Sequence, residues 1–415
     1  MKRWYPAAFA ALSFLAFPCL LRAAEVTDVI DAVDDDDPID INIDVGFHST
    51  LNRSKITHEW ASAWTAGYRP DFNELRFEQQ TYAMDYTVEI GLYHDLELYV
   101  NLPYIISDHK QIGYVSGVSN SSSTLFQASP GLDYPGNAVA QDPTASPSSK
   151  RSGIGDMQVG VKWAIFNDER DDTKSVWILG LDYRIPSGNL NKPQDVAAGG
   201  TGGVGMGQHV LTPFMLFSHR FSILDPYIGI HGSIPIQGKD AKNAGLAEPY
   251  SGGFLAGMEI VPWEVKDKHQ KFAIDVRLTT DYFGEVDSKG DPNQRGTVNE
   301  MSDFLACTYC DDQHPEMYRQ LQAQSNYARF GLHLGFVVRA AEYVRFRCGV
   351  SLEHQTEHFL TGADYCKDMT GDGDCGQAGD INNDFFSTVY DEPGQRLRIE
   401  ETTIFTYWLT GMVTF

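Results

Sequence analysis

The sequence lacks long apolar runs beyond its start and is short of positive charge. After residue 24 there is no stretch of about 18 apolar residues, which excludes a helical membrane protein. Lysine and arginine total 32 against 56 aspartates and glutamates, a formal charge of −24, so we expect no basic surface for nucleic acid. The Gly-x-Ser-x-Gly, His-Glu-x-x-His and P-loop motifs are also missing. We therefore expect no enzyme, and only Asp281, His354 and His358 stand out as candidates for a hydrolytic site.

Residues 1–24 have the layout of a secretory signal peptide. A basic start is followed by an apolar stretch from Ala7 to Leu21 and then by small residues suited to cleavage. The mature chain would begin with an acidic arm at residues 25–38, which includes four consecutive aspartates at 34–37. The charge favours an arm in solvent, and the alternative is a plug that inserts into the interior.

From residue 39 onward, apolar and polar residues alternate with a period of two. Leu96, Leu98 and Val100, for example, are separated by Glu97 and Tyr99. This spacing indicates strands rather than helices, and each run is long enough to cross a bilayer as a tilted strand of about 9–11 residues. The sequence predicts twelve strands, at residues 39–51, 75–93, 95–107, 154–167, 175–186, 208–219, 224–236, 252–263, 271–283, 327–339, 342–356 and 400–415.

The connections between these strands alternate between short turns and long polar segments. The longest polar segments cover residues 108–153, 284–326 and 357–399. Bacterial outer-membrane barrels have short periplasmic turns, long extracellular loops and an even strand number. The sequence thus predicts an all-β fold at residues 39–415, an antiparallel transmembrane β-barrel of about 12 strands in the bacterial outer membrane. A secreted sandwich or propeller is the alternative, but it gives no reason for the alternating connections.

The last predicted strand keeps its alternation up to the final residue, Phe415. A terminal strand that ends in Phe resembles the signal by which outer-membrane proteins are recognised for assembly. We expect the assembly machinery to bind this strand, and outer-membrane lipid and lipopolysaccharide to contact the apolar face of the barrel. Aromatic residues near strand ends, such as Tyr104 and Trp163, would lie at the membrane interfaces.

The charged residues that alternate with the apolar set should face the interior. A charge on the lipid-facing side at mid-depth costs about 2–4 kcal/mol. Acids occur early and bases late, so closure of the barrel would bring Asp85 and Glu89 opposite Arg345 and Arg347 and set the field along a solute path. The alternative is a salt-bridge network that fills the interior. The residues predicted to line the path are Asp85, Glu89, Lys162, Arg184, Asp275, Arg277, Arg329, Arg345 and Arg347.

An acidic, glycine-rich segment at residues 364–384 is the one candidate for metal binding. Asp368, Asp372 and Asp374 surround Gly371 and Gly373, and carboxylate oxygens in such a loop suit Ca²⁺. The segment resembles calcium loops of extracellular proteins, although Gly379 stands where an EF-hand has its bidentate glutamate. It is therefore either a Ca²⁺ site or an acidic loop held by a disulfide, and no other cofactor is expected.

Five cysteines remain after the signal peptide. Cys366 and Cys375 bracket the acidic loop and could form a disulfide in an oxidising compartment. Cys307 and Cys310 form a Cys-x-x-Cys motif that we interpret as a tight disulfide, because no second such motif is present to complete a zinc site. Cys348 falls on the apolar face of its strand and is expected to be unpaired.

Three consecutive motifs resemble one family of outer-membrane barrels. Residues 151–163, RSGIGDMQVGVKW, are similar to a strand of the proteins grouped with meta-pathway phenol degradation (the MetA type), a set of proposed transporters. Residues 94–104, HDLELYVNLPY, match the companion turn and strand, and residues 181–188, LDYRIPSG, continue the order. The resemblance implies passage of small solutes, aromatic or apolar ones included, across the outer membrane.

The expected function is therefore an outer-membrane channel or importer that passes small solutes by diffusion through a charged lumen. The alternative is a structural or surface-interaction barrel whose interior is closed by salt bridges.

Overall fold

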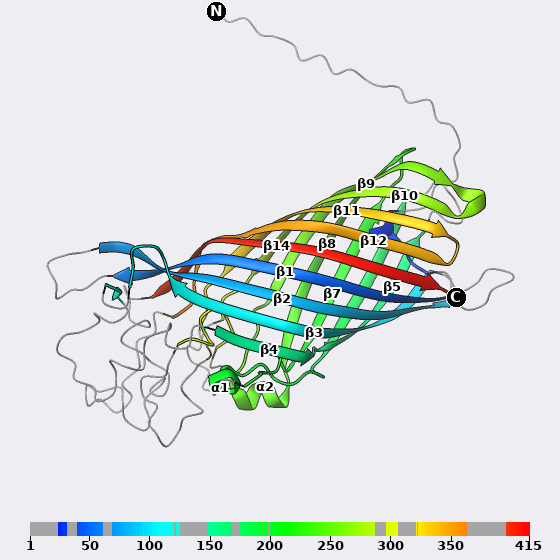
Figure 1. The fold of residues 1–415 in the computed structure, drawn as a ribbon. Helices are drawn as coiled ribbons and strands as arrows, with labels where there is room; N and C mark the ends of the chain where they lie inside the picture. Colours follow the sequence, from blue (N-terminus) through cyan, green and yellow to red (C-terminus); the bar gives the residue numbers. More distant parts are fainter. Residues whose placement is uncertain are drawn as a thin grey trace, which may run out of the picture.

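The computed structural model describes residues 24–30, 40–60, 69–93, 95–119, 122–124, 148–167, 175–197, 200–286, 296–305, 321, 323–362 and 396–415. In this part the strands close a single antiparallel ring (Figure 1), because β14 (Leu397–Thr414) pairs with β1 (Ile41–Trp60), which pairs in turn with β2 (Arg69–Tyr93). The predicted all-β barrel of twelve strands is confirmed. The predicted signal peptide, apart from Ala24, and the four aspartates at 34–37 lie outside the described residues.

The ring follows the order of the chain. Its strands are β1 (Ile41–Trp60), β2 (Arg69–Tyr93), β3 (Leu96–Tyr114), β5 (Met157–Phe166), β6 (Val176–Ile185), β7 (Gln208–Ser218), β8 (Leu224–Gln237), β9 (Ser251–Val265), β10 (Gln270–Phe283), β11 (Tyr327–Ala341), β12 (Val344–Gln355) and β14 (Leu397–Thr414). Short β4 (Ser148–Ile154) pairs with β3 beyond the end of β5, and β13 (His358–Phe359) pairs with β14 beyond the end of β12. The two extra strands therefore extend the ring without widening it.

In the described residues the helices are few and short. They are α1 (Pro193–Ala197), α2 (Lys239–Ala244) and the 3₁₀ turns η1 (Glu25–Thr27) and η3 (Lys266–Lys268). No helix in the described part of the chain is long and apolar enough to cross a membrane.

The two ends of the barrel differ, and we name them the short-turn end and the long-loop end. The short-turn end carries tight connections such as the turn between β11 and β12, together with the C-terminus (Figure 1). At the long-loop end the strands reach farther than predicted. The loop predicted at 108–153 is wrong at both margins, because β3 continues to Tyr114 and β4 begins at Ser148. Polar side chains there hide the two-residue period, although the backbone pairing continues.

The outer surface of the ring is an apolar band. One row crosses four neighbouring strands, where Leu278 pairs with Leu332, Leu332 with Leu352, and Leu352 with Phe405. All four side chains are exposed, Leu278 by 58%. A continuous apolar surface of this kind is unfavourable in water and fits the hydrocarbon of a bilayer.

On the inner surface, large aromatic rings lie across glycines of the neighbouring strand. The ring and the glycine are direct cross-strand partners, and a Cβ at the glycine would overlap the ring. Each ring therefore lies along the wall and leaves the interior free, an arrangement that also stabilises glycines in sheets. Four such pairs occur in the described residues: Tyr99–Gly160, Phe214–Gly180, Tyr227–Gly257 and Trp408–Gly349.

Candidate functional site

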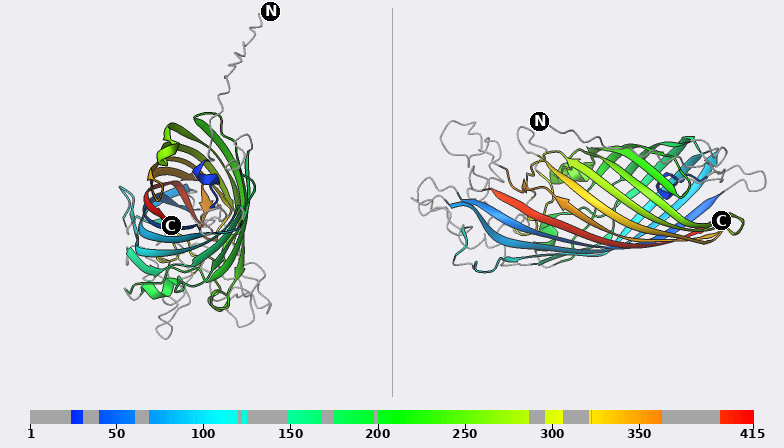
Figure 2. Two further views of the ribbon diagram at one scale, coloured as in Figure 1. Left: turned by 90° about the vertical axis from the view of Figure 1, so that its right-hand side faces the viewer. Right: turned by 90° about the horizontal axis from the view of Figure 1, so that it is seen from above.

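The N-terminal segment, residues 24–30, lies inside the short-turn end of the barrel, where Figure 2 (left) shows it in dark blue within the ring of strands. Asp28 accepts a hydrogen bond of 3.0 Å from Arg345, and the amide of Ile30 donates one of 3.2 Å to Glu97. Val26 and Val29 face an apolar patch of the inner wall. The patch consists of Ala164, Val176, Ile178, Phe214, Leu216 and Leu255. The segment therefore fills part of the lumen at this end.

A second segment, residues 296–305, lies across the long-loop end. It belongs to the connection between β10 and β11, and Met301, Phe304 and Leu305 are almost completely buried. They pack against inward-facing apolar side chains from several strands and from the residue that follows β13. These are Ile56, Leu75, Phe77, Ile112, Leu360, Leu397 and Ile399. We call residues 296–305 the inserted loop.

One buried carboxylate fastens the inserted loop to the wall. Asp303 is fully buried, and its oxygens lie 2.5 Å from Nη2 of Arg151 and 3.6 Å from Nζ of Lys110. The hydroxyl of Ser149 donates a further hydrogen bond of 2.8 Å. Burial alone would raise the pKa of Asp303, but the charges of Lys110 and Arg151 outweigh burial and hold this pKa below its ordinary value. The loop is therefore held by charge as well as by apolar packing.

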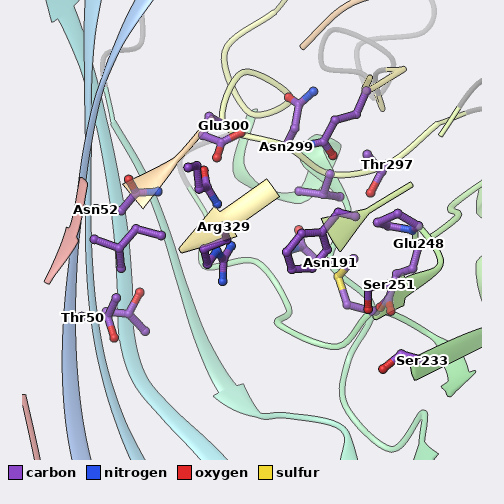
Figure 3. A pocket seen from close by; sticks show the side chains of 18 of the residues that line it. Thr50, Asn52, Asn191, Ser233, Glu248, Ser251, Thr297, Asn299, Glu300 and Arg329 are labelled. Atoms are coloured by element: carbon purple, nitrogen blue, oxygen red, sulfur yellow. The ribbon is translucent and has the colours of Figure 1, made fainter. Parts of the chain in front are cut away.

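Between these two segments lies a cavity of about 820 Å³, which we call the chamber. Thr297, Asn299 and Glu300 of the inserted loop form part of its lining. Figure 3 shows Thr50 and Asn52 of β1 on one side of the chamber, and Asn191, Ser233, Glu248 and Ser251 on the other. Most of the residues that line it have polar side chains. Amide side chains line the chamber at Asn52, Gln79, Gln158, Asn191, Asn299, Gln324 and Gln355, and hydroxyls at Thr50, Thr81, Thr212, Ser233, Ser251, Thr297, Tyr327 and Thr406.

Two pairs of opposite charge lie in the wall of the chamber. Arg184 contacts Glu248, and Nε of Arg329 lies 3.8 Å from the carboxylate of Glu353. Burial raises the pKa of Glu248, and the charge of Arg184 opposes this rise only in part. A carboxyl group of this kind can accept hydrogen bonds from a ligand in a site sheltered from bulk water.

A smaller cavity of about 260 Å³ lies against β1, β2, β12 and β14. Asp85, Glu89 and Arg347 all line it, together with Trp408 and His48, whose Nδ1 is 2.8 Å from Asp85. The closing of the ring thus brings the predicted early acids and one predicted late base into the same space. Arg345, predicted beside them, instead pairs with Asp28 of the N-terminal segment.

The remaining predicted path residues form ion pairs along the wall. Lys162 lies 2.7 Å from Glu97 and 3.9 Å from Glu89. Arg277 lies 2.9 Å from Asp275. Only Arg184 and Arg329 of the nine predicted residues line the chamber itself. The predicted residues therefore divide among the chamber, the smaller cavity and wall-bound ion pairs.

Sequence reasoning missed Asp303 with its partners Arg151 and Lys110, and also Asn191 and Glu248. All five lie in segments that the sequence analysis treated as long polar connections. Met301, Phe304 and Leu305 offered a signal for the inserted loop, because three large apolar residues within five positions are unusual in a solvent-exposed segment.

The three rim residues considered for catalysis do not come together. Asp281 lies 3.1 Å from Nε2 of His231, His354 is exposed and pairs across the outer face with Phe330, and His358 is buried in a stack with the ring of Tyr327. A hydrolytic site needs its base and acid within hydrogen-bond reach of one reacting group.

The predicted metal and disulfide residues cannot be placed. Asp368, Asp372 and Asp374, and also Cys307, Cys310, Cys366 and Cys375, lie outside the described residues. Within the described ranges no group of three or more His, Cys, Asp or Glu side chains is arranged to hold a metal ion. Cys348 is free and exposed on the outer face, as predicted.

No protein-family model matches the sequence, and no curated protein is similar to it. Solved structures with related folds include the COG4313 outer membrane channel from Pseudomonas putida F1, at 8% identity and a TM-score of 0.43, covering 90% of this chain and 95% of that one. A Pseudomonas aeruginosa FadL homologue matches at 8% identity with a TM-score of 0.34, and the match covers 91% of this chain and 90% of that one. The outer membrane protease OmpT from Escherichia coli matches at 7% identity with a TM-score of 0.32, and the match covers 94% of this chain and 100% of that one. The resemblance to the MetA-type family stays a prediction.

Proposed function

We propose that this protein is an outer-membrane channel through which small solutes diffuse, with the chamber on their route. The observation that carries the proposal is a closed ring that is apolar outside and encloses a polar cavity of about 820 Å³. An outer apolar band is unfavourable on a water-soluble barrel. A barrel that only spans the membrane does not need a large polar interior.

The structure corresponds to a closed state in this proposal. The N-terminal segment occupies one end of the lumen and the inserted loop lies across the other. In this proposal a solute that crosses the barrel has to pass both segments, so one of them moves. We take the inserted loop as the movable part, because beside its apolar packing it depends on one buried ionic site that a local change can break.

The location and the membrane partners belong to the same proposal. The apolar band would contact outer-membrane lipid and lipopolysaccharide, and β14 would be the strand that the assembly machinery binds. Aromatic or apolar solutes rest on the family resemblance alone. The polar lining of the chamber gives no specific support for that class.

The alternative is a structural barrel without transport. The wall-bound ion pairs, such as Lys162 with Glu97, favour it because they occupy interior space. Recordings of the full-length protein in planar lipid bilayers separate the two functions. Discrete current steps that heat-denatured protein does not produce would support the channel. Absence of current from both the wild type and a variant with the inserted loop released would contradict the channel and leave the structural barrel.

A further inference from the structure

The chamber keeps buried polar atoms that no group in the described residues satisfies. Nε of Arg184, Oδ1 of Asn191 and Oε1 of Glu248 have no hydrogen-bond partner, and neither does Oε2 of Glu300 in the inserted loop. All four residues line the same cavity. Roughly 90% of buried polar groups in proteins are paired, and an unpaired one costs about 1–3 kcal/mol. Each of these atoms has less than 1 Å² of accessible surface, so a solute in the chamber can supply the missing partner only when the side chain turns toward it.

The unsatisfied atoms include both kinds of hydrogen-bonding group. Nε of Arg184 is a donor, whereas the oxygens of Asn191 and Glu248 are acceptors. Ser233 and Ser251 place hydroxyls in the same lining (Figure 3). A hydroxyl on a ligand donates one hydrogen bond and accepts others, so neighbouring hydroxyls match this mixture of donors and acceptors.

Charge selects against anionic solutes. Each of the three bases that line the chamber lies beside a carboxylate: Arg184 beside Glu248, Arg329 beside Glu353, and Lys110 beside Asp303. The lining itself contains five acids against these three bases, namely Asp108, Asp182, Glu248, Glu300 and Glu353. An anion would therefore meet a net negative field and bases that are already paired.

Apolar solutes would also lose hydrogen bonds in the chamber. Of the 29 residues that line it, six are apolar, namely Met206, Val210, Pro249, Phe283, Val298 and Ile404, and the others carry polar groups. An apolar ligand would displace water from the amides and hydroxyls without replacing the hydrogen bonds, which loses affinity.

We propose that the chamber is a binding site for neutral polyhydroxylated solutes, with small saccharides as the chemical class. The inference rests on the proposed channel function for the route by which the solute enters. The volume of the chamber, about 820 Å³, lies within the range of about 300–1,000 Å³ that is usual for small-molecule sites.

Isothermal titration of the full-length protein in detergent tests this site with three probes. Maltotriose represents the neutral polyhydroxylated class, phenol the aromatic class and gluconate the anionic class. We expect maltotriose to bind more tightly than either of the others. Asn191→Leu, which removes the amide at nearly constant volume, and Glu248→Gln should each weaken maltotriose binding about tenfold. Glu357→Gln is the matched control, because Glu357 is exposed and is not among the chamber residues.

The outcomes separate the site from the channel. Tighter binding of phenol or gluconate than of maltotriose overturns the saccharide site, and so does equal maltotriose affinity in the wild type, Asn191→Leu and Glu248→Gln. Because the wild type alone ranks the three probes, a variant that fails to fold does not remove the test. Current steps without maltotriose binding would overturn this site but not the channel, whereas maltotriose binding without current would support the site and contradict the channel.

Discussion

Replacing Asp303 with alanine should release the inserted loop. The substitution leaves Arg151, which is 1% exposed, and Lys110 as buried charges without their shared carboxylate. Removal of one partner from a buried ion pair costs about 3–5 kcal/mol, which changes the ratio of docked to released loop by roughly 10²- to 10⁴-fold.

This loss is comparable with the other contributions that hold the loop. Burial of Met301, Phe304 and Leu305 contributes about 1.5–3 kcal/mol for each side chain. The ordering of the backbone opposes docking at about 1–2 kcal/mol per residue. Docking is therefore a balance of similar opposing amounts, and the ionic contribution of Asp303 is large enough to decide it.

Single-channel recording in planar bilayers at neutral pH measures the release. We expect Asp303→Ala to conduct more often, or with larger steps, than the wild type, while circular dichroism shows an unchanged content of strand. Asp267→Ala, an exposed change in the turn η3, is the control and should behave as the wild type. A folded Asp303→Ala protein whose conductance equals that of the wild type would refute the gating role of the inserted loop.

Three further predictions concern pH, the inner wall and the outer wall. The pKa of Asp303 is lower in the folded protein than its ordinary value of about 3.9. The contribution of Asp303 to docking of the inserted loop is therefore complete above about pH 3.9 and is lost as the pH falls through the folded pKa. The wild type should gain conductance only below about pH 4, and Asp303→Asn should show no such acid step. Gly160→Val should destabilise the barrel by about 1–3 kcal/mol because the new side chain displaces the ring of Tyr99, measured as a lower temperature for the loss of compact migration in gels, and an unchanged temperature would contradict the close packing. In lipid vesicles, Cys348 should react with a lipid-soluble maleimide and not with a charged, water-soluble one, and equal reaction with both would place this face of β12 in water.

The strands could be predicted from the sequence because each has a different medium on its two faces. Leu332 and Leu352 alternate with polar residues wherever the outer face is apolar and the inner face is not. The alternation also fixed which charges point inward, and closure of the ring then brought Arg347 into one cavity with Asp85 and Glu89.

The ends of the lumen could not be predicted in the same way. Asp303 forms an ion pair with Arg151, which lies 152 residues earlier in the sequence. No periodic pattern in the sequence indicates which part of the wall a loop will contact. For the same reason Arg345 was assigned to the acids of β2, whereas its partner is Asp28 in a segment without strand character. The chamber depends on these docked segments, so its lining could be identified only from the folded chain.

The position of residues 24–30 has a consequence for biogenesis. Ile41 and Phe415 exchange backbone hydrogen bonds at the seam between β1 and β14, so the last residue of the chain completes the wall around a peptide that precedes the first strand. Until that seam forms, the apolar patch beneath Val26 and Val29 belongs to an open, curved sheet. The newly made chain must then either place this peptide before the seam closes or admit it afterwards through the short-turn end. A folding intermediate in which the last strand has not yet paired would expose the apolar patch to water, and an exposed apolar patch promotes aggregation.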